Sequence, residues 1–147
     1  MTDPQTTDER RRLVTESWAA AWDGGEVDAL DALLAPDYRR RTSQDDDGLD
    51  REAFKATIVT TRASFPDLRT VIDDIVVEGD QVAVRWHSTG THTHPFLGVP
   101  ATRSAVQVSG ATFATFGTDG LVHEEHVTWD PRGLLTALGI ITVGQDQ

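Results

Sequence analysis

The stretch from Gly120 to Gly139, with the sequence GLVHEEHVTWDPRGLLTALG, constrains the fold more than any other part of the chain. Its first half alternates polar and apolar side chains, and the side chains of a β-strand point to opposite faces in turn. After Asp130 the pattern changes, because proline suits a first helical position and leucines then follow at helical spacing. The stretch therefore predicts one long strand that runs directly into a closing helix.

Strand alternation divides the charged side chains of this stretch between two faces. One face is expected to present Glu124, His126 and Asp130 in a row, together with Val122 and Thr128. Two carboxylates and an imidazole at a strand–helix junction could form the polar part of a binding pocket. Asp130 is explained equally well as a helix cap, because Asp is a favoured N-cap and Asp-Pro is a common helix opening. The sequence leaves both interpretations open.

Length and composition indicate a single domain. The 147 residues, 38% of them apolar, predict one domain at 8–142 between flexible tails at 1–7 and 143–147. The absence of cysteine excludes disulfides, thiolate metal sites and cysteine nucleophiles. No apolar run is as long as a membrane span, and the first residues lack the apolar centre of an export signal. A cytoplasmic protein is expected.

Charge and missing motifs narrow the classes of function. The net charge of −11 disfavours nucleic-acid binding, and the two arginine triplets, residues 10–12 and 39–41, are flanked by acids and interpreted as solvated. Lys55, the only lysine, lies in an amphipathic pattern rather than an apolar pocket, which argues against Schiff-base chemistry. No phosphate loop, dinucleotide fingerprint or Gly-x-Ser-x-Gly elbow is found, so nucleotide binding and serine hydrolysis have no support.

The remaining chain reads as helices first and strands afterwards. Three helices before an antiparallel meander imply an α+β domain, in which a curved sheet forms a cone with an interior for a small molecule. Asp50 is expected to cap the third helix. The patterns predict helices at 8–23, 26–34 and 50–64, and strands at 38–42, 68–78, 81–91 and 102–116 before the final strand.

Aromatic and histidine residues add candidates for the interior. Trp18 and Trp22 lie one helical turn apart, and either core packing or an aromatic cavity wall explains them. Trp86 is likewise core or cavity wall. His92 and His94 form an HxH pair that supplies only two metal ligands, so we expect no metal there, and His92 is the better candidate for a substrate-facing group at the cavity mouth.

Four segments, in this order, resemble the SnoaL-like polyketide cyclases and the wider ester cyclase group, which belong to the nuclear-transport-factor-two-like superfamily. They are AWDGGEVDALDALLAPDY, SFPDLRTVIDDIVVEGDQVAVRW, GTHTHPFLGVPA and the closing stretch GLVHEEHVTWDPRGLLTALG. The resemblance extends from about residue 10 to residue 139. It implies a curved antiparallel sheet forming a cone closed by three N-terminal helices, a short C-terminal helix, and a homodimer formed through the outer sheet face.

The resemblance also implies a reaction. In SnoaL-like cyclases an intramolecular aldol closes a ring, and an aspartate near the end of the last long strand acts as general acid and base. Asp130 occupies the matching position. The chain departs from the family pattern at His126, where a tryptophan is frequent, at His94, where a glycine is common, and around Phe113 and Phe116, which replace a charged or histidine residue.

The predicted function is a cofactor-independent cyclase or isomerase acting on a hydrophobic polyketide-like or small carbonyl metabolite. A carboxylate in a partly apolar cavity would have the raised pKa that this chemistry needs. Two alternatives stay open: epoxide hydrolysis by Glu124 or Asp130 with Arg85 or Arg103, and a non-catalytic binding or dimerisation domain. The predicted catalytic residues are Asp130 and His126, and the predicted substrate-binding residues are His92, Trp18, Trp22, Trp86, Phe113 and Thr128.

Overall fold

The computed structural model describes residues 5–43 and 47–140. Residues 143–147, predicted as a tail, and residues 1–4 of the tail predicted at 1–7 lie outside this part. The elements in chain order are α1 (Thr7–Trp18), the π-helical turn η1 (Ala19–Asp23), the 3-10 helix η2 (Val27–Ala32), β1 (Leu34–Arg41), α2 (Arg51–Ser64), β2 (Arg69–Glu78), β3 (Gln81–Thr91), β4 (Ala105–Phe116), β5 (Val122–Trp129) and α3 (Arg132–Ala137).

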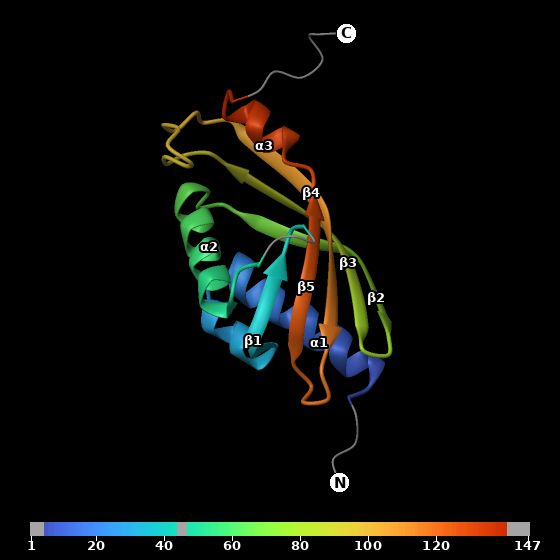
Figure 1. Ribbon diagram of the computed structural model, residues 1–147. Helices are drawn as coiled ribbons and strands as arrows, with labels where there is room; N and C mark the ends of the chain where they lie inside the picture. The colour runs from blue at the N-terminus through green and yellow to red at the C-terminus, as the bar shows by residue number, and fades with distance from the viewer. Residues whose placement is uncertain (1–4, 44–46, 141–147) are drawn as a thin grey trace.

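The five strands form one curved sheet that does not close, in the order β1-β5-β4-β3-β2 (Figure 1). Strands β2 to β5 are antiparallel neighbours, as the turn signals between them predict. Strand β1, however, pairs with β5 in parallel, so the prediction of a wholly antiparallel sheet is wrong. A parallel neighbour requires a long crossover, and here most of the domain connects the two strands. The α+β class itself is confirmed.

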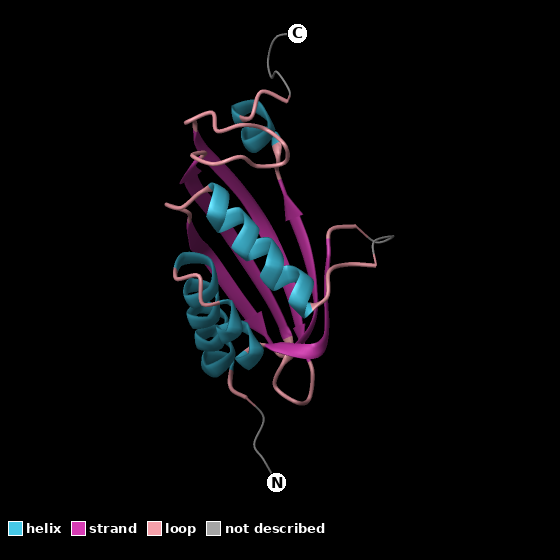
Figure 2. Ribbon diagram, turned by 90° about the vertical axis from the view of Figure 1, so that its left-hand side faces the viewer, coloured by secondary structure: helices cyan, strands magenta, loops and turns pink. Residues whose placement is uncertain are grey.

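The helices cover one face of this sheet, as Figure 2 shows, and α3 lies at one end of it (Figure 1). Both long helices begin at side-chain caps: Thr6 Oγ1 accepts from the Glu9 amide at 3.0 Å, and Asp50 Oδ1 accepts from the Ala53 amide at 2.8 Å. The predicted Asp50 cap is confirmed. Buried side chains from both layers form the core, among them Val14, Leu30, Phe54, Ile58, Val84 and Phe116.

The segments predicted as the first two helices are less regular than expected. The α-helix ends at Trp18, and a π-helical turn follows, in which the Gly24 amide donates to the Ala19 carbonyl at 3.1 Å. The segment predicted as a helix at 26–34 is a 3-10 helix of six residues, Val27–Ala32. It is short because β1 already begins at Leu34. No helix of the described residues is long and apolar enough to cross a membrane.

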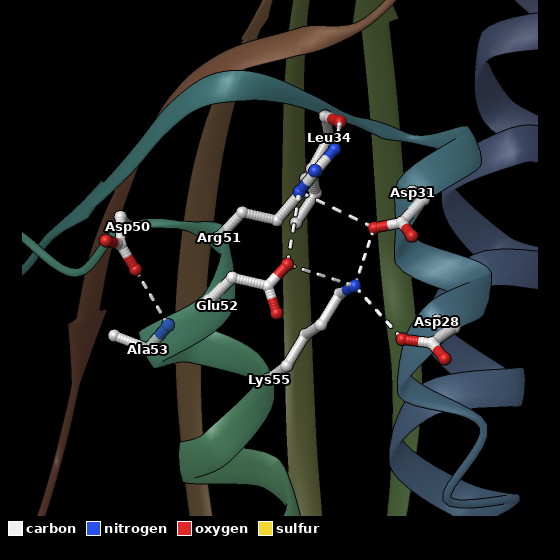
Figure 3. Close-up of polar contacts among 8 residues, drawn as sticks. All are labelled: Asp28, Asp31, Leu34, Asp50, Arg51, Glu52, Ala53 and Lys55. Carbon is white, nitrogen blue, oxygen red and sulfur yellow. Dashed lines mark hydrogen bonds and ion pairs between the residues drawn. The ribbon is translucent and has the colours of Figure 1, made fainter.

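A cluster of charges joins η2 to α2 (Figure 3). Lys55 Nζ lies 2.7 Å from Asp31, 3.1 Å from Asp28 and 3.5 Å from Glu52, and its side chain is buried. The hydrogen bond to Asp31 is the main reason that the pKa of Lys55 is raised, so the amine stays charged. A charged amine is a poor nucleophile, and Lys55 serves here as an ion-pair partner.

Candidate active site

A cavity of about 310 Å³ lies between the helices and the curved sheet. This volume is at the lower end of the range, about 300–1,000 Å³, that is usual for small-molecule sites. All four tryptophans of the chain contribute to its wall: Trp18 from α1, Trp22 from η1, Trp86 from β3 and Trp129 at the end of β5. Phe65 and Phe96 complete the aromatic part of the wall.

Contacts within the sheet hold two of these tryptophans in place. Trp86 Nε1 donates to Thr112 Oγ1 at 3.0 Å, which satisfies its polar atom within the sheet. Gly110 on β4 makes room for the two tryptophans beside it, because a Cβ atom there would lie 2.7 Å from the Trp86 ring and 2.7 Å from the Cβ atom of Trp129. Trp18, Trp22 and Trp86, predicted as substrate-binding residues, are therefore placed in the wall, while substrate binding itself stays a prediction.

One charged cluster interrupts this apolar wall, where β1 and β5 run side by side (Figure 1). Arg40 and Glu125 are direct partners in the parallel register, and Arg40 Nη1 lies 3.8 Å from Glu125 Oε1. Tyr38, two residues before Arg40 and on the same face of β1, donates its hydroxyl to Glu125. Arg40 lines the cavity, and its guanidinium lies 4.5 Å from the ring centroid of Phe54.

Burial dominates the electrostatics of this Tyr38–Arg40–Glu125 cluster. Only 4% of Glu125 and none of Tyr38 is exposed. Burial raises the pKa of the Glu125 carboxyl, and the nearby Arg40 charge and the Tyr38 hydrogen bond oppose this shift only in part. The pKa of Tyr38 is also raised, mainly by burial, so its hydroxyl stays protonated. The cluster thus combines a carboxyl group that can take up a proton with a cation at the cavity wall.

Asp130 lies in a different environment. Its half-exposed carboxylate accepts from the Arg132 amide at 3.0 Å and from the Arg132 guanidinium at 3.1 and 3.2 Å. The Arg132 side chain is the main cause of a lowered pKa. The expected raised pKa at this position is therefore wrong, because the carboxylate faces a cation and solvent. The N-cap position of α3 is Pro131, without a side-chain cap hydrogen bond, so Asp130 is not the N-cap residue; its carboxylate bonds the amide of Arg132, the first residue of α3.

Three further predicted residues point away from the cavity. Val127 and Trp129 line it, so alternation along β5 places His126 and Thr128 on the outer face. Phe113, the register partner of His126 on β4, is 53% exposed on the same outer face. The prediction that these side chains face the interior is wrong because, from Glu125 to Trp129, the inner face of β5 carries the odd-numbered residues. His126 Nε2 instead lies 3.0 Å from Glu124 Oε1.

His92 is fully buried behind the cavity wall rather than at its mouth. Its Nδ1 atom accepts from the Thr102 amide at 3.2 Å, and its ring packs against Phe65, which lines the cavity. Its Nε2 atom has no hydrogen-bond partner among the described residues. His94 Nδ1 lies 2.9 Å from the neighbouring Thr93 hydroxyl. Within residues 5–43 and 47–140, no group of three or more His, Asp or Glu side chains could hold a metal.

The pairs considered for epoxide hydrolysis are not brought together at the cavity. Arg85 Nε donates to Asp74 at 2.8 Å, and Glu124 accepts from Arg41 Nε at 3.0 Å. Asp130 has Arg132 as its cation. None of these carboxylates is among the residues that line the cavity in the described part of the chain.

Comparison with known proteins identifies the family of the chain. The sequence profile of the SnoaL-like polyketide cyclases matches residues 12–138. The chain belongs to the SnoaL-like polyketide cyclase family. A search of curated proteins finds no significant match.

Solved structures from Streptomyces share the fold. AclR of Streptomyces galilaeus, a proposed hydroxylase, is 27% identical with a TM-score of 0.83, and the match covers 93% of this chain and 100% of AclR. TsrD of Streptomyces laurentii is 28% identical with a TM-score of 0.80 and the same coverage, 93% and 100%. IdmH of Streptomyces antibioticus, a proposed polyketide cyclase, is 28% identical with a TM-score of 0.75, covering 89% and 99%.

Sequence reasoning missed the Tyr38–Arg40–Glu125 cluster, in which Arg40 lines the cavity and Tyr38 and Glu125 are buried beside it. Glu125 could have been found, since it shares a strand face with Val127 and Trp129, and an acid among such neighbours is exceptional. Arg40 could not, because it lies in a run of three arginines and only the parallel pairing of β1 with β5 turns it inward. Tyr38 depends on the same pairing.

Proposed function

We propose that this SnoaL-like protein is a cofactor-independent acid/base enzyme that closes a ring, or shifts a proton, in a hydrophobic carbonyl metabolite. The observation that carries the proposal is the Tyr38–Arg40–Glu125 cluster, in which Arg40 lines an apolar cavity and the buried Glu125 lies 3.8 Å from Arg40 Nη1. A ring-closing aldol or a keto–enol isomerisation needs a base for an acidic C–H proton and a group that stabilises the enolate oxygen. The cluster supplies both kinds of group.

Each residue has a distinct role in this proposal. The substrate carbonyl oxygen is bound by the Arg40 guanidinium, which stabilises the negative charge as the enolate forms. Glu125 takes the proton from the carbon next to that carbonyl, and the enolate carbon then attacks a second carbonyl of the same molecule. The alkoxide formed there takes the proton back, so no atom is gained or lost. Tyr38 holds the Glu125 carboxyl in position through its hydroxyl.

Burial of Glu125 suits this role. A base works best when its pKa approaches the working pH, and burial raises the pKa of this carboxyl from its ordinary range. Asp130, with its lowered pKa and its bonds to Arg132, is proposed to hold the first residue of α3 rather than to move protons. Family membership and likeness to proposed polyketide cyclases support the reaction class, and the metabolite itself is not specified by either.

Deuterium exchange into 2-tetralone, an apolar bicyclic ketone, tests the proposal without the natural substrate. We expect the wild type to accelerate incorporation at the carbon beside the carbonyl, as followed by NMR. Glu125→Gln should slow this catalysed exchange by about 10²–10⁴-fold, because it removes the base. Asp130→Asn and His126→Gln, which change acid and imidazole outside the cavity, serve as matched controls and should retain it.

Two results would contradict the proposal. If Asp130→Asn loses the exchange while Glu125→Gln keeps it, Asp130 is the acid/base and the cavity cluster is structural. If the wild type exchanges no faster than buffer, the domain binds a small molecule without catalysis. Thermal unfolding of each variant establishes that it is folded before its rate is compared.

A further inference from the structure

The charge pattern of the cavity narrows the class of molecule that it can hold. Among the cavity-lining residues of the described chain, Arg40 is the only ionisable one. The lining hydroxyl groups are largely satisfied within the protein. Thr57 and Thr61 donate to carbonyls of α2 at 3.1 and 2.8 Å, and Thr70 and Ser88 pair with each other at 2.7 Å.

The cation at Arg40 is only weakly compensated. Among the described residues, Glu125 is the acid paired with Arg40, at 3.8 Å from Nη1 and so beyond hydrogen-bond distance, and the buried Nη1 atom has no hydrogen-bond partner there. Tyr38 is already committed to Glu125. The interior therefore carries a guanidinium whose fork of donors suits a carboxylate.

We propose that the cavity recognises keto acids. These molecules have a flat fused-ring body and one carboxylate beside the reactive carbonyl, and the carboxylate and the carbonyl oxygen both face Arg40. In this proposal the tryptophan wall contacts the rings, whose number is limited by the cavity volume of about 310 Å³. A β-keto acid presents its carboxylate and its carbonyl oxygen on one edge, which matches the planar guanidinium. This inference rests on the proposed function, because it uses the same cavity and the same enolisable carbonyl.

Long-range electrostatic attraction to the protein surface cannot produce a preference for a carboxylate. The net charge of the chain is −11, so its overall field repels an anion from the surface. A carboxylate that binds more tightly than its neutral ester must be recognised locally. In the cavity wall, Arg40 is the residue that can do this.

Calorimetric titration with matched pairs of probes tests the inference. The probes are salicylate, 1-hydroxy-2-naphthoate and 3-hydroxyanthracene-2-carboxylate, stable mimics of an enolised β-keto acid, each beside its methyl ester. We expect the naphthoate or the anthracene acid to bind the wild type at least about tenfold more tightly than its ester. Arg40→Gln should abolish this preference, and Arg40→Lys should restore part of it.

Arg41→Gln is the matched control. Arg41 is the next residue of the same strand, but its Nε donates to Glu124 at 3.0 Å and it is not among the cavity-lining residues. This variant should keep the full preference for the acid. The inference is overturned if the wild type binds acid and ester equally, or binds no acid at about 1 mM. These two results come from the wild type alone, so they hold even if Arg40→Gln does not fold. A preference that survives in folded Arg40→Gln, or is lost in Arg41→Gln, overturns it as well.

The outcomes separate this inference from the proposed function. 2-Tetralone carries no carboxylate, so its deuterium exchange reports acid/base catalysis alone. Exchange without a preference for acids would refute the inference and leave the proposed function standing. A preference for acids without deuterium exchange would refute the proposed function and leave the preference for a carboxylate standing.

Discussion

Glu125 and Asp130 are two acids five residues apart on the same strand–helix segment, and their environments are opposite. Glu125 is buried between Tyr38 and Arg40, and burial raises its pKa. Asp130 is half-exposed and bonded to Arg132, whose side chain lowers its pKa. The difference teaches that the face of the sheet, rather than the position along the chain, decides whether a carboxylate here can act as a base.

The largest contrast is expected from removing each acid. Glu125→Leu leaves the Arg40 cation and the Tyr38 hydroxyl without their acid, and breaking such a buried pair costs about 3–5 kcal/mol of unfolding free energy. Asp130→Leu should leave the unfolding free energy close to that of the wild type, because solvent replaces its contacts. Urea denaturation of the two variants measures the difference. Equal destabilisation would contradict the difference in environment between Glu125 and Asp130.

Tyr38→Phe tests the contribution of the hydrogen bond to the buried Glu125. The variant keeps the ring but removes the hydroxyl that donates to Glu125, which should cost about 1–2 kcal/mol. Because that hydrogen bond lowers the pKa of Glu125, its loss should raise the pKa further. Denaturation and carboxyl titration of the variant measure the two effects. A pKa that falls or does not move would contradict the assigned hydrogen bond.

The pH dependence of stability should differ in sign for the two acids. Unfolded protein releases the Glu125 proton near its ordinary pKa of 4.5, whereas folded protein retains it to higher pH. The contribution of Glu125 is therefore complete below pH 4.5 and is lost as pH rises through the folded pKa, with a slope of at most about 1.4 kcal/mol per pH unit. For Asp130 the contribution is present above its ordinary pKa of 3.8 and is lost as pH falls.

Unfolding free energies of wild type, Glu125→Gln and Asp130→Asn over a pH series test these signs. The difference between wild type and Glu125→Gln should decline as pH rises from 4.5, the ordinary pKa of Glu125. The difference between wild type and Asp130→Asn should grow as pH rises through the acid range. The same sign for both differences would show that the two carboxyl groups share one kind of environment.

The smallest effect is expected from Asp130→Ala and should be local. Loss of the bond to the Arg132 amide should speed hydrogen exchange in α3 about threefold to tenfold, while exchange in the sheet stays unchanged. Asp119→Ala is a suitable control, because it removes an exposed acid that accepts from Leu121 at the β4–β5 turn. Mass spectrometry of peptides from residues 130–140 measures the effect. Unchanged exchange there would contradict the proposal that Asp130 holds the first residue of α3.

Local patterns predicted the fold well where local physics decides it. The Asp50 cap, the antiparallel pairing of β2 with β3 across Gly79 and Asp80, and the strand that runs into α3 all follow from residues close in sequence. The place of β1 beside β5 depends on a pairing between residues about eighty positions apart, and nothing local specifies it. The order of the strands in the sheet therefore could not be predicted from the sequence.

The same limit explains the candidate site. Alternation correctly separated Glu124, His126 and Asp130 from Glu125, but it could not say which face is inside. The family resemblance pointed to Asp130 through the motif before α3, whereas the buried acid is Glu125. Its partner Arg40 becomes visible only when β1 is placed next to β5.

The most direct test of the central claim is an NMR titration of the side-chain carboxyl carbons of Glu125 and Asp130 in one wild-type sample. Glu125→Gln and Asp130→Asn assign the two signals. We predict a midpoint for Glu125 above its ordinary 4.5 and a midpoint for Asp130 below its ordinary 3.8. A Glu125 midpoint at or below 4.5, the ordinary value, would contradict the claim that this chain holds its base inside the cavity wall.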